Sequence, residues 1–91
     1  MIAAPDGRVF VTPTGGPALA TGGTGDVLAG VIAATAARAD DIALSAARAC
    51  WWHGRAGDLV AASAGGGSEA VAGALPLAMA RDGIAPEWPF A

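Results

Sequence analysis

Hydrophobic residues recur with helical spacing through the middle of the chain. A first helix is predicted to begin at Asp26, because residues three and four positions apart after it form one apolar face. The residues of this face are Leu28, Val31, Ile32 and Thr35. We expect Arg38 in the last turn, where a positive charge suits the helix dipole. Asp40 or Asp41 then offers an N-cap for a second, longer helix that extends to about Ala62.

The residues before the first helix follow a different pattern. A turn dipeptide and a β-branched run at residues 6–12 predict a short strand, and residues 2–4 are its expected hairpin partner. Residues 13–25 alternate Thr, Gly and Pro around a small apolar island. We therefore expect no regular structure in this stretch.

Glycines at residues 65–67 are predicted to end the second helix. A third helix follows, with Ser68 as its cap and Glu69 as a negative charge in its first turn. Pro76 is expected to kink or end this helix. Residues 86–91 show no period, so we expect an irregular tail there.

The second predicted helix carries a stripe of small residues. Gly54 and Gly57 each cost about 1 kcal/mol relative to alanine in a helix, and Cys50 and Ala61 continue the stripe at helical spacing. We expect another element to pack closely against it, with Cys50 as a small buried apolar residue. His53 lies within this stretch, and a histidine in such a position favours a packing role over a catalytic one.

Two further pairs in this helix favour structural roles. Arg55 and Asp58 have the i,i+3 spacing of a helix-surface pair. Trp51 and Trp52 are adjacent, and adjacent helical positions cannot both face one core. One of the two indoles is therefore expected to cover a neighbouring element or a subunit.

The composition limits the chain to one small domain with a thin core. Its 91 residues have a mass of 8.8 kDa, and alanine supplies much of the 54% hydrophobic content. Alanine buries little area, and the 14 glycines add chain entropy that folding must overcome. We therefore treat residues 1–91 as a single partial domain that depends on a partner segment, and we expect a homo-oligomer.

Charge and cysteine content exclude several classes of function. The formal net charge is −3, and the five basic residues are all arginine and form no block, which argues against a nucleic-acid ligand. The absence of lysine excludes a Walker A loop. The single Cys50 cannot build a disulfide framework or a zinc site and fits a reducing compartment, so we expect a cytoplasmic protein and assign no metal ligand. The longest uncharged run, between Arg8 and Asp26, contains too many Gly and Pro residues for a membrane span.

The most informative stretch is the glycine-rich turn before the first helix. Gly22, Gly23 and Gly25 allow backbone N–H groups to point at one anion, where the helix N-terminus adds about half a positive charge. Asp26 cannot ligate a phosphate itself, because like charges repel, and its natural role is that of a general base toward a hydroxyl beside the phosphate. The alternative is an ordinary turn in which Asp26 only caps a helix.

The same stretch carries a resemblance to a known family. Residues 14–30 (TGGPALATGGTGDVLAG), followed by residues 53–58 (HGRAGD), resemble the C-terminal part of the ADP-dependent NAD(P)H-hydrate dehydratases, the YjeF C-terminal-type members of the ribokinase-like superfamily. The resemblance covers about residues 4–77. It implies the C-terminal part of a ribokinase-like three-layer α/β/α fold.

The resemblance also implies a reaction and its participants. The family restores NADH or NADPH from the hydrates NADHX and NADPHX: ADP, or in some members ATP, phosphorylates the hydrate hydroxyl, and phosphate is then lost. Asp26 matches the base and hydrate-binding residue of the family, and Gly25 matches its nucleotide-contacting glycine. By the same resemblance, Gly22, Gly23 and Thr24 would complete the anion hole. Mg²⁺ is the expected companion of the nucleotide, and an NAD(P)H-hydrate epimerase domain or protein is an expected partner.

The sequence departs from the family pattern in two respects. The family shows Gly-Asn-Pro-Gly-Met where this chain has Gly-Gly-Pro-Ala-Leu at residues 15–19, so an asparagine contact is lost. Family members are also much longer, and we expect the chain to be a C-terminal fragment. Two other readings stay open: a ribokinase-like small-molecule kinase that keeps the phosphorylated product, and a non-catalytic remnant that acts as an interaction module.

Overall fold

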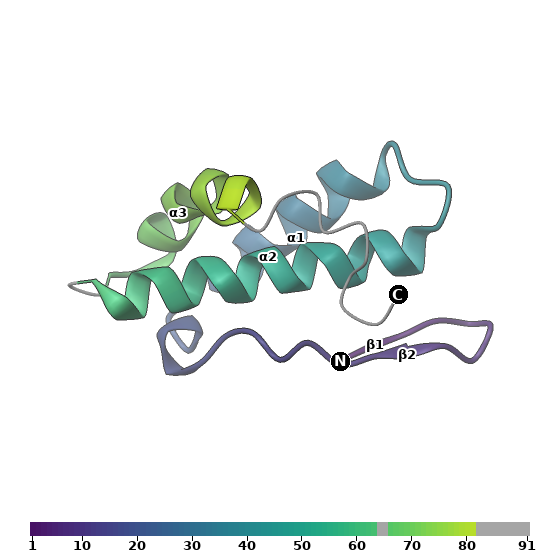
Figure 1. Ribbon diagram of the computed structural model, residues 1–91, viewed down its shortest axis with the longest axis horizontal. Coiled ribbons are helices and arrows are strands. Elements are labelled where there is room, and N and C mark those ends of the chain that lie inside the picture. Colours follow the sequence, from purple (N-terminus) through teal and green to yellow (C-terminus); the bar gives the residue numbers. More distant parts are fainter. Residues whose placement is uncertain (64–65, 82–91) are drawn as a thin grey trace.

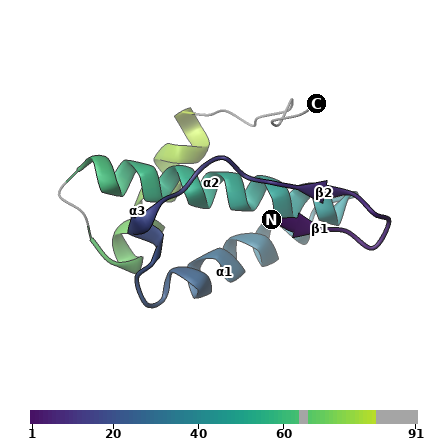
Figure 2. The ribbon, with the colours of Figure 1, turned by 90° about the horizontal axis from the view of Figure 1, so that it is seen from below.

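The computed structural model describes residues 1–63 and 66–81. The elements in chain order are β1 (Ile2–Ala3), β2 (Val9–Phe10), the 3₁₀ turn η1 (Pro17–Leu19), α1 (Thr24–Ala36), α2 (Ile42–Ala62) and α3 (Ser68–Arg81). Helix α2 runs through the middle of the molecule. The hairpin and the loop that follows it lie along one side of α2, and α1 and α3 pack on other sides (Figures 1 and 2).

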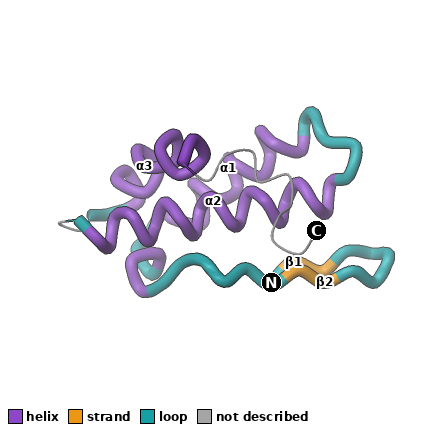
Figure 3. The backbone as a smooth tube through the Cα atoms, viewed as in Figure 1, coloured by secondary structure: helices purple, strands orange, loops and turns teal. Residues whose placement is uncertain are grey.

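The predicted N-terminal hairpin is confirmed. Strands β1 and β2 pair antiparallel, with Ile2 opposite Phe10 (Figure 3). The chain reverses through Gly7, whose φ of 95° favours glycine and whose N–H donates to the carbonyl oxygen of Ala4 at 3.0 Å. In the following loop the prediction of no regular structure is wrong at one place. Residues 17–19 form η1, because Pro17 fixes φ at its start.

The first helix begins two residues earlier than predicted and ends earlier too. Gly23 is its N-cap with φ 93°, so Thr24 is the first helical residue in place of Asp26. Because α1 ends at Ala36, Arg38 lies beyond the helix, and the prediction of Arg38 in its last turn is wrong.

The second and third helices follow the sequence pattern closely. Asp41 caps α2, and its carboxylate accepts the N–H of Leu44 at 3.1 Å. Ser68 is the first residue inside α3 and not its cap, because the carbonyl of Gly67 already accepts the N–H of Ala70 at 3.0 Å. Pro76 lies within α3 and does not end it.

The core of the described residues is thin, as the alanine content predicts. It lies where α2 meets α3 and α1, and Val71 is the largest side chain that is fully buried. Its buried hydrophobic residues are Ala47, Ala49, Trp52, Ala56, Val60, Val71 and Ala78. Trp52 enters this core while Trp51 stays half-buried, which confirms that the two indoles face different surroundings. Cys50 is also half-buried, and this burial raises the pKa of its thiol.

The described residues agree with the predicted fold class, since a small hairpin followed by three helices is an α/β arrangement. None of the described helices is both long and apolar enough to cross a membrane. The predicted irregular tail at residues 86–91 falls outside the described residues.

Candidate functional site

A glycine-rich turn leads directly into α1, and the buried side chain of Thr24 bonds to backbone atoms inside this turn. Thr24 is only 5% exposed. Its hydroxyl donates to the carbonyl oxygen of Leu19 at 2.6 Å and shares this hydrogen with that of Thr21 at 2.9 Å. Its backbone N–H also donates to Thr21, at 3.3 Å. The Thr24 side chain and amide therefore hold the shape of the turn.

The N–H groups that follow Thr24 are open. The first intrahelical donor of α1 is Val27, whose N–H reaches the carbonyl of Gly23 at 3.2 Å, so the N–H groups of Gly25 and Asp26 have no partner in the helix. Neither has another acceptor within residues 1–63 and 66–81. A methyl group added at Gly25 would meet no heavy atom within 4 Å. Two unpaired donors thus lie exposed at the positive end of the helix dipole, an arrangement that suits an anion.

Asp26 stands beside these donors. It is the acidic residue in the first turn of α1, and its side chain is exposed. The described residues contain no group of three or more His, Cys, Asp and Glu side chains that could hold a metal ion. Asp26 is therefore a carboxylate open to solvent, next to a place where an anion can bind.

A cavity among the described residues lies away from the turn. It measures about 1060 Å³ and opens between the end of α1, the start of α2 and the end of α3. Thr35, Arg38, Ser45 and Trp52 are among its lining residues, and neither the glycine-rich turn nor Asp26 belongs to that set. Since the two places are at opposite ends of α1, the cavity and the turn are separate features.

Helix α2 packs against the turn and the loop before it, and the individual hydrogen bonds between them were not predicted from the sequence. The ring nitrogen Nε2 of His53 lies 3.0 Å from the carbonyl oxygen of Thr24. The hydroxyl of Thr14 donates to the carbonyl oxygen of Trp51 at 2.9 Å, and the N–H of Gly15 donates to the carboxylate of Asp58 at 3.3 Å. The expected packing role of His53 is confirmed, and Asp58 has a role in the loop that its surface spacing did not indicate.

The small-residue stripe explains how the loop comes this near to α2. A Cβ atom at Gly54 would collide with Thr14, and one at Gly57 would lie 2.6 Å from the side chain of Leu19. The predicted close approach is therefore confirmed, and the loop at residues 14–19 is its partner. The glycine spacing was the signal in the sequence that could have located these contacts.

Comparison with known proteins identifies the family. A family model described as NAD(P)H-hydrate dehydratase matches residues 1–78. The chain therefore belongs to the NAD(P)H-hydrate dehydratase family, which confirms the resemblance. No solved structure matches the chain.

Individual relatives agree with this assignment. The bifunctional NAD(P)H-hydrate repair enzyme Nnr of Gloeobacter violaceus is 47% identical over 62 residues, which is 68% of this chain and 12% of the relative. The enzyme of the same name from Moorella thermoacetica is 46% identical over 71% of this chain and 12% of its own length. The ADP-dependent (S)-NAD(P)H-hydrate dehydratase of Neisseria meningitidis is 36% identical over 82% of this chain and 25% of its own length. The chain thus spans a quarter or less of these relatives.

Proposed function

We propose that residues 22–26 form the phosphate-binding turn and carry the general base of an ADP-dependent NAD(P)H-hydrate dehydratase. The observation that carries the proposal is the pair of unpaired, exposed N–H groups at Gly25 and Asp26, directly beside the Asp26 carboxylate. Membership of the dehydratase family supports the choice of reaction. The matched Neisseria protein is named as ADP-dependent, which supports ADP over ATP as the nucleotide.

The backbone of the turn is proposed to bind the nucleotide phosphate. Gly22 and Gly25 have open space where a Cβ atom would be, Gly23 lies against the side chain of Ser68, and the dipole of α1 favours negative charge at this point. Thr24 supports the proposed anion hole by fixing the turn through its hydroxyl. Such donors stabilise the charge that develops on a phosphoryl group during its transfer.

Asp26 is proposed to bind the hydroxyl of NADHX or NADPHX and to accept its proton. The oxygen then bonds to the terminal phosphorus of ADP, and AMP leaves. Breaking of the carbon–oxygen bond releases inorganic phosphate, and loss of a proton from the adjacent carbon restores the ring double bond of NADH or NADPH. One AMP and one phosphate accordingly form for each reduced nicotinamide.

Other participants follow from the same assignment. Mg²⁺ is proposed to be held chiefly by the nucleotide phosphates, because Asp26 does not belong to a group of three or more possible metal ligands within the described residues. The wall that faces Asp26 is proposed to come from polypeptide that corresponds to the rest of the longer relatives. The word bifunctional in the names of two relatives supports a second linked activity, which we propose to be the expected epimerase. A cytoplasmic homo-oligomer stays a prediction.

The test is a chimera in which this chain replaces its matched segment in the Neisseria dehydratase, assayed with NADHX and ADP. Asp26→Asn is expected to retain ADP affinity in calorimetric titration and to lower turnover by about 100-fold or more, the usual contribution of a general base. Asp40→Asn is the matched control, because Asp40 is an exposed carboxylate in the loop after α1. Turnover that is unchanged in Asp26→Asn removes this residue from its role as base.

Product analysis separates the two alternative functions. The dehydratase regenerates the absorbance of reduced nicotinamide and releases phosphate, whereas a ribokinase-like kinase accumulates a phosphorylated product without that absorbance. A non-catalytic module gives neither product and shows no heat of binding with ADP. Each result identifies one of the three functions.

A further inference from the structure

The segment of α2 from His53 to Asp58 contacts the start of α1 and the loop before it, and the polar contacts of His53 and Asp58 with them end on backbone atoms. His53 reaches the carbonyl of Thr24, and Asp58 accepts the N–H of Gly15. Backbone contacts of this kind fix the path of the chain.

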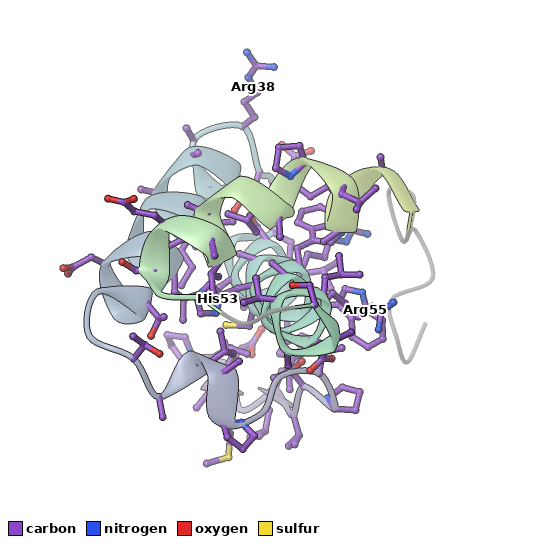
Figure 4. All side chains as sticks on the ribbon, turned by 90° about the vertical axis from the view of Figure 1, so that its left-hand side faces the viewer. Arg38, His53 and Arg55 are labelled. Atoms are coloured by element: carbon purple, nitrogen blue, oxygen red, sulfur yellow. The ribbon has the colours of Figure 1, made fainter. Side chains whose placement is uncertain are left out.

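His53 makes the contact that is nearest to the proposed site. Its side chain is 6% exposed, and Nε2 lies 3.0 Å from the carbonyl oxygen of Thr24. A carbonyl oxygen can only accept, so Nε2 carries the hydrogen. Figure 4 shows His53 on the side of α2 that faces α1, whereas Arg55 lies on the opposite side of α2. The bond therefore ties the first residue of α1 to the buried face of the central helix.

The position of this bond connects it with the open donors. Thr24 immediately precedes Gly25 and Asp26, and its carbonyl group belongs to the peptide unit that carries the N–H of Gly25. A hydrogen bond to that carbonyl oxygen restrains the orientation of the peptide, because the planar unit moves as one body. Together with the helical backbone of α1, the bond therefore restrains the direction of the Gly25 N–H.

The glycines of α2 make the short distance possible. A Cβ atom at Gly54 would overlap Thr14, and one at Gly57 would overlap Leu19. The loop can therefore lie directly on α2, and the carbonyl of Leu19 can in turn accept the hydroxyl of Thr24. His53 bonds to Thr24 from the other direction, so the start of α1 is held at both its side chain and its backbone.

We infer that His53 is a positioning residue that orients the N–H of Gly25 toward the nucleotide phosphate through the carbonyl of Thr24. The inference rests on the proposed function for its ligand, and it goes beyond that function in assigning a task to a buried residue outside the turn. A side chain that only filled space at this position would need no donor at Nε2. The hydrogen bond is therefore what separates positioning from packing.

Two amide substitutions form a matched test. Glutamine places its side-chain N–H close to the position of the histidine Nε2, whereas the shorter asparagine does not reach it. We expect His53→Asn to accelerate amide hydrogen exchange at Val27 and Leu28 in the first turns of α1 by about tenfold or more, with core amides at Val60 and Val71 unchanged. His53→Gln is expected to restore exchange at Val27 and Leu28 to the unsubstituted rate. NMR-detected exchange on the full 91-residue chain provides the measurement.

Several outcomes would overturn the inference. Uniform acceleration at Val27, Leu28, Val60 and Val71 would assign His53 to packing alone, and so would equal effects of the two variants. Should His53→Asn fail to fold, a long-range ¹H–¹⁵N spectrum of the unsubstituted chain decides the question, because the inference requires a proton on Nε2. An Nε2 without hydrogen contradicts it.

Calorimetric titration of ADP into the Neisseria chimera adds a second, independent readout. We expect ADP affinity to fall about tenfold in the His53→Asn chimera and to recover in His53→Gln. If the unsubstituted chimera does not bind ADP, the proposed function fails, while the exchange comparison on the 91-residue chain still decides whether His53 fixes the turn. Normal ADP affinity in His53→Asn overturns the inference and leaves the proposed function intact.

Discussion

At the scale of single residues, a substitution at Gly25 should affect ADP binding and stability differently. A Cβ atom at Gly25 would meet no heavy atom within 4 Å, and the residue lies in the first turn of α1. Gly25→Ala should therefore leave the free energy of unfolding unchanged or raise it by up to about 1 kcal/mol, because alanine favours helix. ADP affinity should nevertheless fall about tenfold, because the methyl group would occupy space that the phosphate needs. Urea unfolding and calorimetric titration measure the two effects.

Gly30→Ala is the matched control for this prediction. Gly30 is also exposed, lies in the same helix, and has open space where its Cβ atom would be. This variant should gain helix stability by a similar amount and bind ADP normally. Equal ADP affinities of the Gly25 and Gly30 variants would contradict a nucleotide contact at Gly25.

Residue types alone predicted part of the candidate site and missed another part. Asp26 and the flanking glycines could be named because a carboxylate after a glycine-rich turn has few chemical roles. The inward direction of Thr24 could not be predicted, because it depends on the carbonyls of Leu19 and Thr21 converging on one hydroxyl. The hydrogen bond between His53 and Thr24 could not be predicted either, since it joins residues that are 29 positions apart.

At the scale of elements, replacing Gly54 of α2 by alanine should destabilise the protein, although alanine in place of glycine usually stabilises a helix. Gly54→Ala should lower the free energy of unfolding by about 1–3 kcal/mol, because the new methyl group overlaps Thr14 and the loop must move. Gly73→Ala in α3 is the control, because no atom lies within 4 Å of its Cβ position. That variant should raise stability by up to about 1 kcal/mol. Urea unfolding of both variants tests the difference, and equal signs would contradict close packing of the loop.

How well the ends of each helix could be predicted depends on whether a local cap, a backbone angle or tertiary packing determines them. The start of α2 depends on a local cap, and Asp41 could be identified from the sequence as one of two candidates. The start of α1 depends on the positive φ of Gly23, which three neighbouring glycines made ambiguous, and the predicted start was two residues late. Pro76 allowed either a kink or an end, and packing of Val71 and Ala78 against α2 keeps the helix intact around it.

At the scale of the whole molecule, the hairpin contributes no residue to the buried core, and a polar contact helps to attach it to the helices. The hairpin is only two residue pairs long, and Met1, Val9 and Val11 are exposed. Strand β1 contacts α2, and an ion pair of Arg8 with Asp41, the cap of α2, adds a second link between the hairpin and the helices. No pattern in the sequence indicated this pair, because its two residues lie 33 positions apart and on different elements.

This ion pair predicts a pH dependence of the attachment. The Arg8 guanidinium donates to both carboxylate oxygens of Asp41, at 2.7 and 3.0 Å, and these bonds lower the pKa of Asp41 from 3.8 to about 2. Because the folded-state pKa is below the unfolded value, the pair stabilises the chain above about pH 4, and this contribution is lost as the pH falls through about 2. Arg8→Gln should raise the pKa of Asp41 toward 3.8, leaving the backbone N–H groups of Leu44 and Ala43 to lower it.

Carboxyl ¹³C NMR titration of Asp41 measures this shift directly, and Arg38→Gln is the matched control. Arg38 is exposed and extends away from the body of the molecule (Figure 4), so its removal changes the net charge equally without touching the pair. The salt dependence of the Asp41 pKa provides a second measurement, because high salt weakens an exposed ion pair. High salt should raise this pKa more in the unsubstituted chain than in Arg8→Gln. A pKa that is the same in Arg8→Gln and Arg38→Gln would show that the net charge, and not the contact between the hairpin and α2, holds this carboxylate ionised.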